Sequence, residues 1–103
     1  MNAPTPLDAE TARAAKVFLQ QLEGRYTVRE AILYGSRARG DHRPHSDADI
    51  AIILSGLRGN RYKVVGDFAA IEFDVMLETG ILIQAVPFWE DEMRHPEQFN
   101  NPA

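Results

Sequence analysis

The sequence predicts a small α/β sandwich in which helices and strands alternate along the chain. Three short apolar segments alternate with segments whose apolar residues recur at helical spacing. The length of 103 residues fits one domain, and 45% hydrophobic with 25% charged residues is typical of a folded globular chain. We expect one domain over 1–103, with a core over 9–95 and short tails at 1–7 and 97–103.

Two long helices are predicted from apolar periodicity and from residues that begin or end helices. The first covers Ala9–Glu23, with Asp8 as its N-cap and Gly24 at its end. The second covers 61–78 and ends at Thr79 and Gly80. Two shorter helices are expected at 37–40, with Ser36 as N-cap, and at 89–94.

Three strands are predicted between these helices, at 31–34, 47–54 and 81–86. The unbroken apolar run at 50–54 indicates a central strand that is buried on both faces. Pro87 is expected to stop the third strand, because proline cannot donate to a sheet ladder.

Composition excludes several classes of protein. The absence of cysteine excludes disulfides and thiolate metal sites, and no apolar run approaches the ~20 residues of a membrane-spanning helix. The net charge of −4 argues against direct nucleic-acid binding. Residues 25–45 contain five arginines and two acidic residues, which favours binding of a small anion. Residues 67–97 contain eight acidic residues and one arginine. We expect a cytoplasmic protein whose acidic segment is a solvated face or meets a basic partner.

Two aspartates mark the start of the predicted central strand. Asp47 and Asp49 are two residues apart, so their side chains project from the same face of the strand. Two neighbouring carboxylates repel each other, and Mg²⁺ takes one or two carboxylates beside phosphate and water. The continuation into an apolar strand excludes an EF-hand loop. The pair therefore predicts a magnesium site.

A glycine-serine turn precedes this pair. Gly35 allows a close approach of the backbone, and the amides of the helix start with the Ser36 hydroxyl can hold a phosphate. The segment is no P-loop, because Asp41 stands where the lysine is required. The turn and the aspartates together predict a phosphate cradle beside a metal site.

These residues resemble a known signature. Gly-Ser-x-Ala-Arg-Gly at 35–40, with Ser-Asp-x-Asp-Ile placing Asp47 eleven residues after Ser36, is similar to the DNA polymerase β-type nucleotidyltransferase superfamily. Within it the chain is most similar to the minimal nucleotidyltransferase (MNT) family. The resemblance implies a mixed sheet with flanking helices, ATP as substrate and transfer of a nucleoside monophosphate to an acceptor hydroxyl.

The resemblance also implies roles for individual residues. Gly35 and Ser36 would hold the β- and γ-phosphates, and Asp47 and Asp49 would bridge two Mg²⁺ ions.

Arginine and histidine side chains in and after the predicted short helix each have two interpretations. Arg37 or Arg39 could pair with phosphate, and an ion pair with Asp41 is the alternative. His42 and His45 could touch nucleotide or acceptor, or be ordinary exposed loop residues.

Members of the superfamily place a third carboxylate on a neighbouring strand, where this chain has the neutral Gln84. Glu72, Asp74 and Glu78 on the preceding helix remain as candidates or as a solvated helix face. We select Asp74 as the third catalytic carboxylate, because it lies near the apolar stripe.

Two functions follow. The first is a metal-dependent nucleotidyltransferase that transfers AMP from ATP to a HEPN-type toxin, acting as an antitoxin within a hetero-oligomer, as the resemblance implies. The second is a catalytically weak binding module of the same fold that neutralises its partner by contact; Gln84 favours it.

Overall fold

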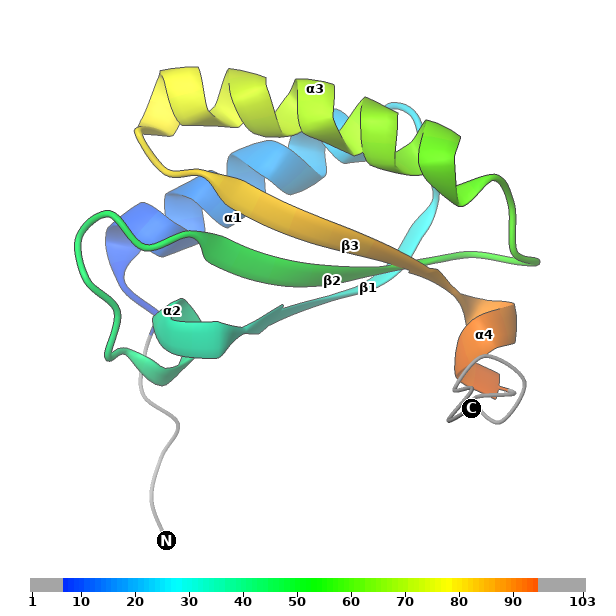
Figure 1. The fold of residues 1–103 in the computed structure, drawn as a ribbon, viewed down its shortest axis with the longest axis horizontal. Helices are drawn as coiled ribbons and strands as arrows, with labels where there is room; N and C mark the ends of the chain where they lie inside the picture. The colour runs from blue at the N-terminus through cyan, green and yellow to red at the C-terminus, as the bar shows by residue number, and fades with distance from the viewer. Residues whose placement is uncertain (1–6, 95–103) are drawn as a thin grey trace, which may run out of the picture.

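The computed structural model describes residues 7–94 and contains four helices and three strands in that range (Figure 1). Their order alternates along the chain as the sequence predicts. In order the elements are α1 (Ala9–Glu23), β1 (Val28–Tyr34), α2 (Gly35–Arg39), β2 (Ala48–Leu54), α3 (Arg61–Thr79), β3 (Ile83–Trp89) and α4 (Glu90–Arg94).

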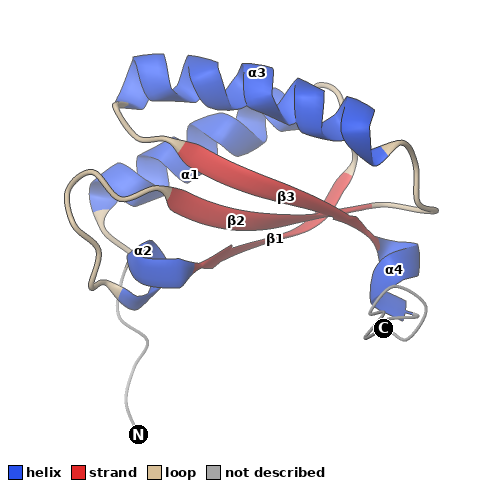
Figure 2. Ribbon diagram, viewed as in Figure 1, coloured by secondary structure: helices blue, strands red, loops and turns tan. Residues whose placement is uncertain are grey.

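The three strands form one mixed sheet in the order β1-β2-β3. β1 and β2 are antiparallel, whereas β2 and β3 are parallel and are joined by the crossover helix α3. Figure 2 shows α1 and α3 together on one side of the sheet. The predicted fold class and the central position of 47–54 are confirmed.

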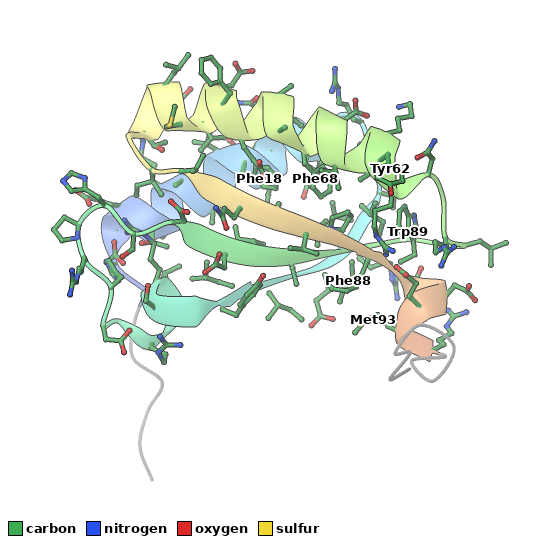
Figure 3. All side chains as sticks on the ribbon, viewed as in Figure 1. Phe18, Tyr62, Phe68, Phe88, Trp89 and Met93 are labelled. Carbon is green, nitrogen blue, oxygen red and sulfur yellow. The ribbon has the colours of Figure 1, made fainter. Side chains whose placement is uncertain are left out.

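The core lies between this pair of helices and the sheet. Phe18 of α1 and Phe68 of α3 are almost completely buried, and their rings meet edge to face at 5.9 Å (Figure 3). Their sheet-side neighbours are alternate residues of β2, which include Ile50 and Ile52. The helical periodicity and the strand alternation therefore direct their apolar residues to one shared core.

Within residues 7–94 no long helix lies on the other face of the sheet (Figure 2), and we call it the open face. Its residues alternate with those of the core, so each pairs with an open-face residue on the next strand. It consists of Glu30, Ile32 and Tyr34 on β1, Asp49, Ala51 and Ile53 on β2, and Gln84, Val86 and Phe88 on β3.

Two strands differ from the prediction in length. β1 begins at Val28, with a bulge between Val28 and Glu30. β3 runs through Pro87 to Trp89, because the backbone of Pro87 points away from β2 and needs no donor there. The expectation that Pro87 stops the strand is wrong. No helix within 7–94 has the length and apolarity needed to cross a membrane.

Candidate active site

Asp47 and Asp49 lie at the start of the central strand. Asp47 immediately precedes β2, and Asp49 is its second residue. Both residues are half-buried, and their spacing places both on the open face. Strand order therefore sets the pair at the middle of the sheet, where both neighbouring strands can contribute groups.

Gly35 closes one side of this pair. Tyr34, the last residue of β1, pairs with Asp49 in the ladder, so the next residue turns beside the carboxylate. Gly35 has φ +77°, and a Cβ placed on it would lie 2.6 Å from Oδ2 of Asp49. Glycine is required here for its backbone conformation and for the close approach.

The short helix α2 begins at Gly35, two residues earlier than the sequence predicts. Its N-cap is Tyr34, which makes no side-chain cap, so the prediction of Ser36 as N-cap is wrong. The chain passes directly from β1 into the helix, which leaves no room for a separate cap residue. Ser36 stands in the first turn, where backbone amides have no acceptor within the helix. It can still present a hydroxyl and an amide to an anion.

Arg37 does not face an open site. Its side chain is 2% exposed and donates from Nε to the Ser46 carbonyl at 2.7 Å. The two terminal nitrogens donate to Thr11 Oγ1 at 2.8 Å and to the Pro44 carbonyl at 3.1 Å. The guanidinium is thus held by protein acceptors, and this corrects the expectation that Arg37 pairs with phosphate.

The contacts of Arg37 continue into α1. Thr11 donates from Oγ1 and from its backbone amide to the carboxylate of Asp8, the confirmed N-cap of α1. These two bonds, with a smaller effect of His42, hold the pKa of Asp8 below its usual value. His42 Nε2 lies 3.6 Å from Asp8 Oδ1, so His42 is half-buried against α1. This network fixes the loop that leads into Asp47.

Arg39 and His45 lie outside this network. Arg39 is exposed and donates from Nε to Asp41 Oδ2 at 3.2 Å, which is the ion pair that the sequence offered as an alternative. His45 is exposed in the loop. The structure gives neither side chain a contact with Asp47 or Asp49.

Asp74 is not brought to the aspartate pair. It is exposed on α3 and lines a shallow depression with Gln21 and Arg25 at the α1 side. α3 covers the core face of the sheet, whereas Asp47 and Asp49 lie on the open face. The expectation of Asp74 as third carboxylate is therefore corrected: its neighbours on α3 supply the apolar stripe, but its own side chain turns away from the sheet.

The position beside Asp49 on β3 belongs to Gln84, which pairs with it in register and is exposed. Glu72 is the helix acid that comes nearest this strand position. It accepts a hydrogen bond from the Ala85 amide at 2.8 Å, and its burial raises its pKa. Across residues 7–94 no three acidic or histidine side chains gather as a metal site.

The donor set fits a divalent cation that arrives with phosphate. Two carboxylates on one face supply oxygen ligands that suit Mg²⁺, which keeps water and phosphate as its other ligands. A Cβ on Gly35 would crowd the Asp49 carboxylate, so glycine leaves Oδ2 unobstructed by a side chain at this position. Asp47 and Asp49 would hold the ion, and Gly35 and Ser36 would face the phosphates.

A mixed sheet with two long helices on one face, and a glycine-serine turn beside two aspartates at the start of β2 on the other, is typical of a nucleotidyltransferase fold. The nucleotidyltransferase domain family matches residues 13–97, and the chain belongs to this family. The structure is similar to the crystal structure of a "putative nucleotidyltransferase" from Sulfolobus solfataricus, with a TM-score of 0.55 and 20% identity. That match covers 92% of this chain and 84% of the other. Among curated proteins, none matches this sequence.

Proposed function

We propose that this protein transfers a nucleoside monophosphate, AMP from ATP, to an acceptor hydroxyl with the help of Mg²⁺. The observation that carries the proposal is the contact between the Gly35 turn and the Asp49 carboxylate. It brings a helix start, which suits phosphate, against an acid, which suits a metal.

The chain's own residues bind and orient the triphosphate. Ser36 would hold the β- and γ-phosphates with its hydroxyl and amide, and Gly35 lets them approach the backbone. Asp47 and Asp49 would hold up to two Mg²⁺ ions between themselves and the phosphates. Bound Mg²⁺ supplies charge that polarises the α-phosphate and stabilises pyrophosphate as the leaving group.

The reaction forms a bond between the acceptor oxygen and the α-phosphorus. The bond from the α-phosphorus to the bridging oxygen breaks, and pyrophosphate leaves in line. The acceptor hydroxyl loses its proton. Because Gln84 beside Asp49 is neutral, that proton passes to solvent or to a base of the acceptor protein.

We propose a HEPN-type toxin as the acceptor, which makes this chain an antitoxin in a hetero-oligomer. The support is the similarity of 35–49 to the MNT signature. The site also lies on the open face of the sheet, which no long helix covers in the described chain, so a macromolecular hydroxyl can reach it.

The second candidate is a binding module that neutralises its partner by contact alone. Gln84 is the observation that favours it, because it occupies the strand position next to Asp49. Asp74 does not compensate for the missing acid, since it lies on the other side of the sheet.

Labelled ATP distinguishes the two. The protein, Mg²⁺ and the protein encoded by the neighbouring reading frame are incubated with ATP labelled either at the α- or at the γ-phosphate. A transferase moves only the α-label to protein and releases γ-label as pyrophosphate. Transfer of γ-label would indicate a kinase, and a stable complex without any label transfer would support the binding module.

Asp47→Asn is the matched inactive variant, and Asp74→Asn is its control. We expect label transfer to be lost in the first and kept in the second. Loss in both, with ATP binding retained in the Asp74 variant, would give Asp74 a role that its place in the structure does not suggest.

A further inference from the structure

We propose that β1 is the interface through which two copies of this chain pair, edge to edge, into one continuous sheet. β1 is an edge strand, and five of its seven residues are exposed. Ile32 is 42% and Tyr34 44% exposed, and both belong to the apolar stretch at 31–34. An exposed apolar edge is a template for strand pairing. The proposal does not depend on the proposed function.

The opposite edge of the sheet is protected against a further strand along 85–89. The Ala48 amide donates to the Leu82 carbonyl, so the even-numbered residues of β3 direct their backbone amides and carbonyls toward β2. The odd-numbered residues of β3 direct theirs outward. Among these, Ala85 donates its amide to Glu72, Pro87 has no amide, and Trp89 donates to Glu92.

The side chain of Arg61 adds to this protection by donating to the Pro87 carbonyl. Arg61 is itself fixed by an ion pair with Glu92 and by the Trp89 ring 5.2 Å away. Natural sheets protect edges with such charged side chains and prolines. Association by strand addition is therefore directed to β1.

The edge of β1 has no comparable protection. The even-numbered residues of β2 form backbone hydrogen bonds with β3, so the odd-numbered residues form theirs with β1. Their partners on β1 are Glu30, Ile32 and Tyr34. Ala31 and Leu33 consequently direct their amides and carbonyls outward. Within residues 7–94 no side chain or loop supplies a partner to these groups.

A second copy complements this edge in one antiparallel register. A two-fold axis through Ile32 sets Ala31 of each chain opposite Leu33 of the other. Each of these two pairs exchanges two backbone hydrogen bonds, which gives about four in all. Ile32 then faces its own copy, and Glu30 faces Tyr34, whose hydroxyl can donate to the carboxylate. No like charges oppose each other, whereas an axis through Glu30 would oppose two carboxylates.

Sedimentation velocity over a range of concentrations tests the interface. We expect the wild-type protein to sediment with twice the chain mass of 11.6 kDa at high concentration, and the Ala31→Pro variant to sediment with the mass of a single chain. Proline removes an outward amide and spares the β1–β2 ladder. Ala31→Lys serves as a second variant if the first fails to fold, as judged by circular dichroism. Leu77→Lys, on exposed α3, is the control that should still dimerise.

Amide exchange gives an independent readout within the same strand. We expect the amides of Ala31 and Leu33 to gain protection as concentration rises, whereas those of Ile32 and Tyr34 are protected throughout. A wild type that stays monomeric, a dimer that survives both Ala31 variants, or protection of Leu33 that is independent of concentration would each overturn the proposal.

Discussion

The Gly35 backbone lies against the Asp49 carboxylate so closely that a single Cβ would come within 2.6 Å of Oδ2. Gly35 directly follows β1, Asp49 lies in β2, and these two strands are neighbours in the sheet. Their contact joins the start of α2 to the start of β2, and it is the point at which the candidate phosphate and metal groups meet.

Gly35→Ala should weaken binding of MgATP by pushing the Asp49 carboxylate aside. It should also lower the free energy of unfolding by about 1–2 kcal/mol, because an alanine adopts positive φ at a cost. Titration calorimetry and urea unfolding measure the two effects.

Gly56→Ala is the matched control for this change. Gly56 has φ +88°, but a Cβ there would meet nothing within 4 Å. It should lose about the same 1–2 kcal/mol and keep its affinity for MgATP. Equal loss of affinity in both variants would show that backbone strain alone, and not the contact with Asp49, governs binding.

Asp47→Asn and Asp49→Asn should each abolish Mg²⁺-dependent ATP binding, with the fold retained because like-charge repulsion is removed. Asp74→Asn should bind MgATP as wild type does, since Asp74 lies on the helix side of the sheet. Calorimetry with and without Mg²⁺ decides the point. Unchanged affinity in both strand variants would remove the metal site.

Arg37→Met should cost about 3 kcal/mol of unfolding free energy, because it leaves two carbonyls and a hydroxyl without their buried donor. Arg39→Met removes only an exposed ion pair and should change stability by less than about 1 kcal/mol. Urea unfolding compares the two. Similar losses would mean that the Arg37 contacts contribute little.

Glu72→Gln should be at least as stable as wild type at neutral pH, because the amide oxygen keeps the bond from Ala85 and avoids burying a charge. Burial raises the pKa of Glu72 in the folded state above the ordinary 4.5. The folded state therefore holds its proton longer, and wild type loses stability as pH rises from 4.5 through the folded pKa.

The measurement for Glu72 is the difference in unfolding free energy between variant and wild type as a function of pH. That difference should vanish below pH 4.5 and grow above it. A difference that grows toward acid instead would mean that the ionised carboxylate stabilises the fold through its bond to Ala85.

The sequence was sufficient for elements whose signals are local. Asp8 and Thr11 are three residues apart, so the cap of α1 could be read directly, and alternation alone places Asp47 and Asp49 on one face. The partners of Arg37 could not be predicted in this way. Thr11 is 26 residues away, and the other two acceptors are backbone carbonyls of a loop that carries no pattern.

The sequence also could not show which side of the sheet a helix residue faces, or which way the backbone of a strand residue points. The sequence places Asp74 on a helix near apolar residues, but the rotation of α3 against the sheet decides which way it points. Pro87 stays within β3 because of the sheet position of its backbone, which depends on strand order. Both are properties of the assembled sheet and not of any short segment.

The side chains along β3 also decide how far self-association can go. A sheet with two receptive edges can add chain after chain and grow into a fibre. Here Glu72, Arg61 and Pro87 terminate one edge, so a chain that pairs through β1 has no second edge to offer. Strand addition between copies ends at a closed pair, and high concentration should enrich that pair without polymerisation.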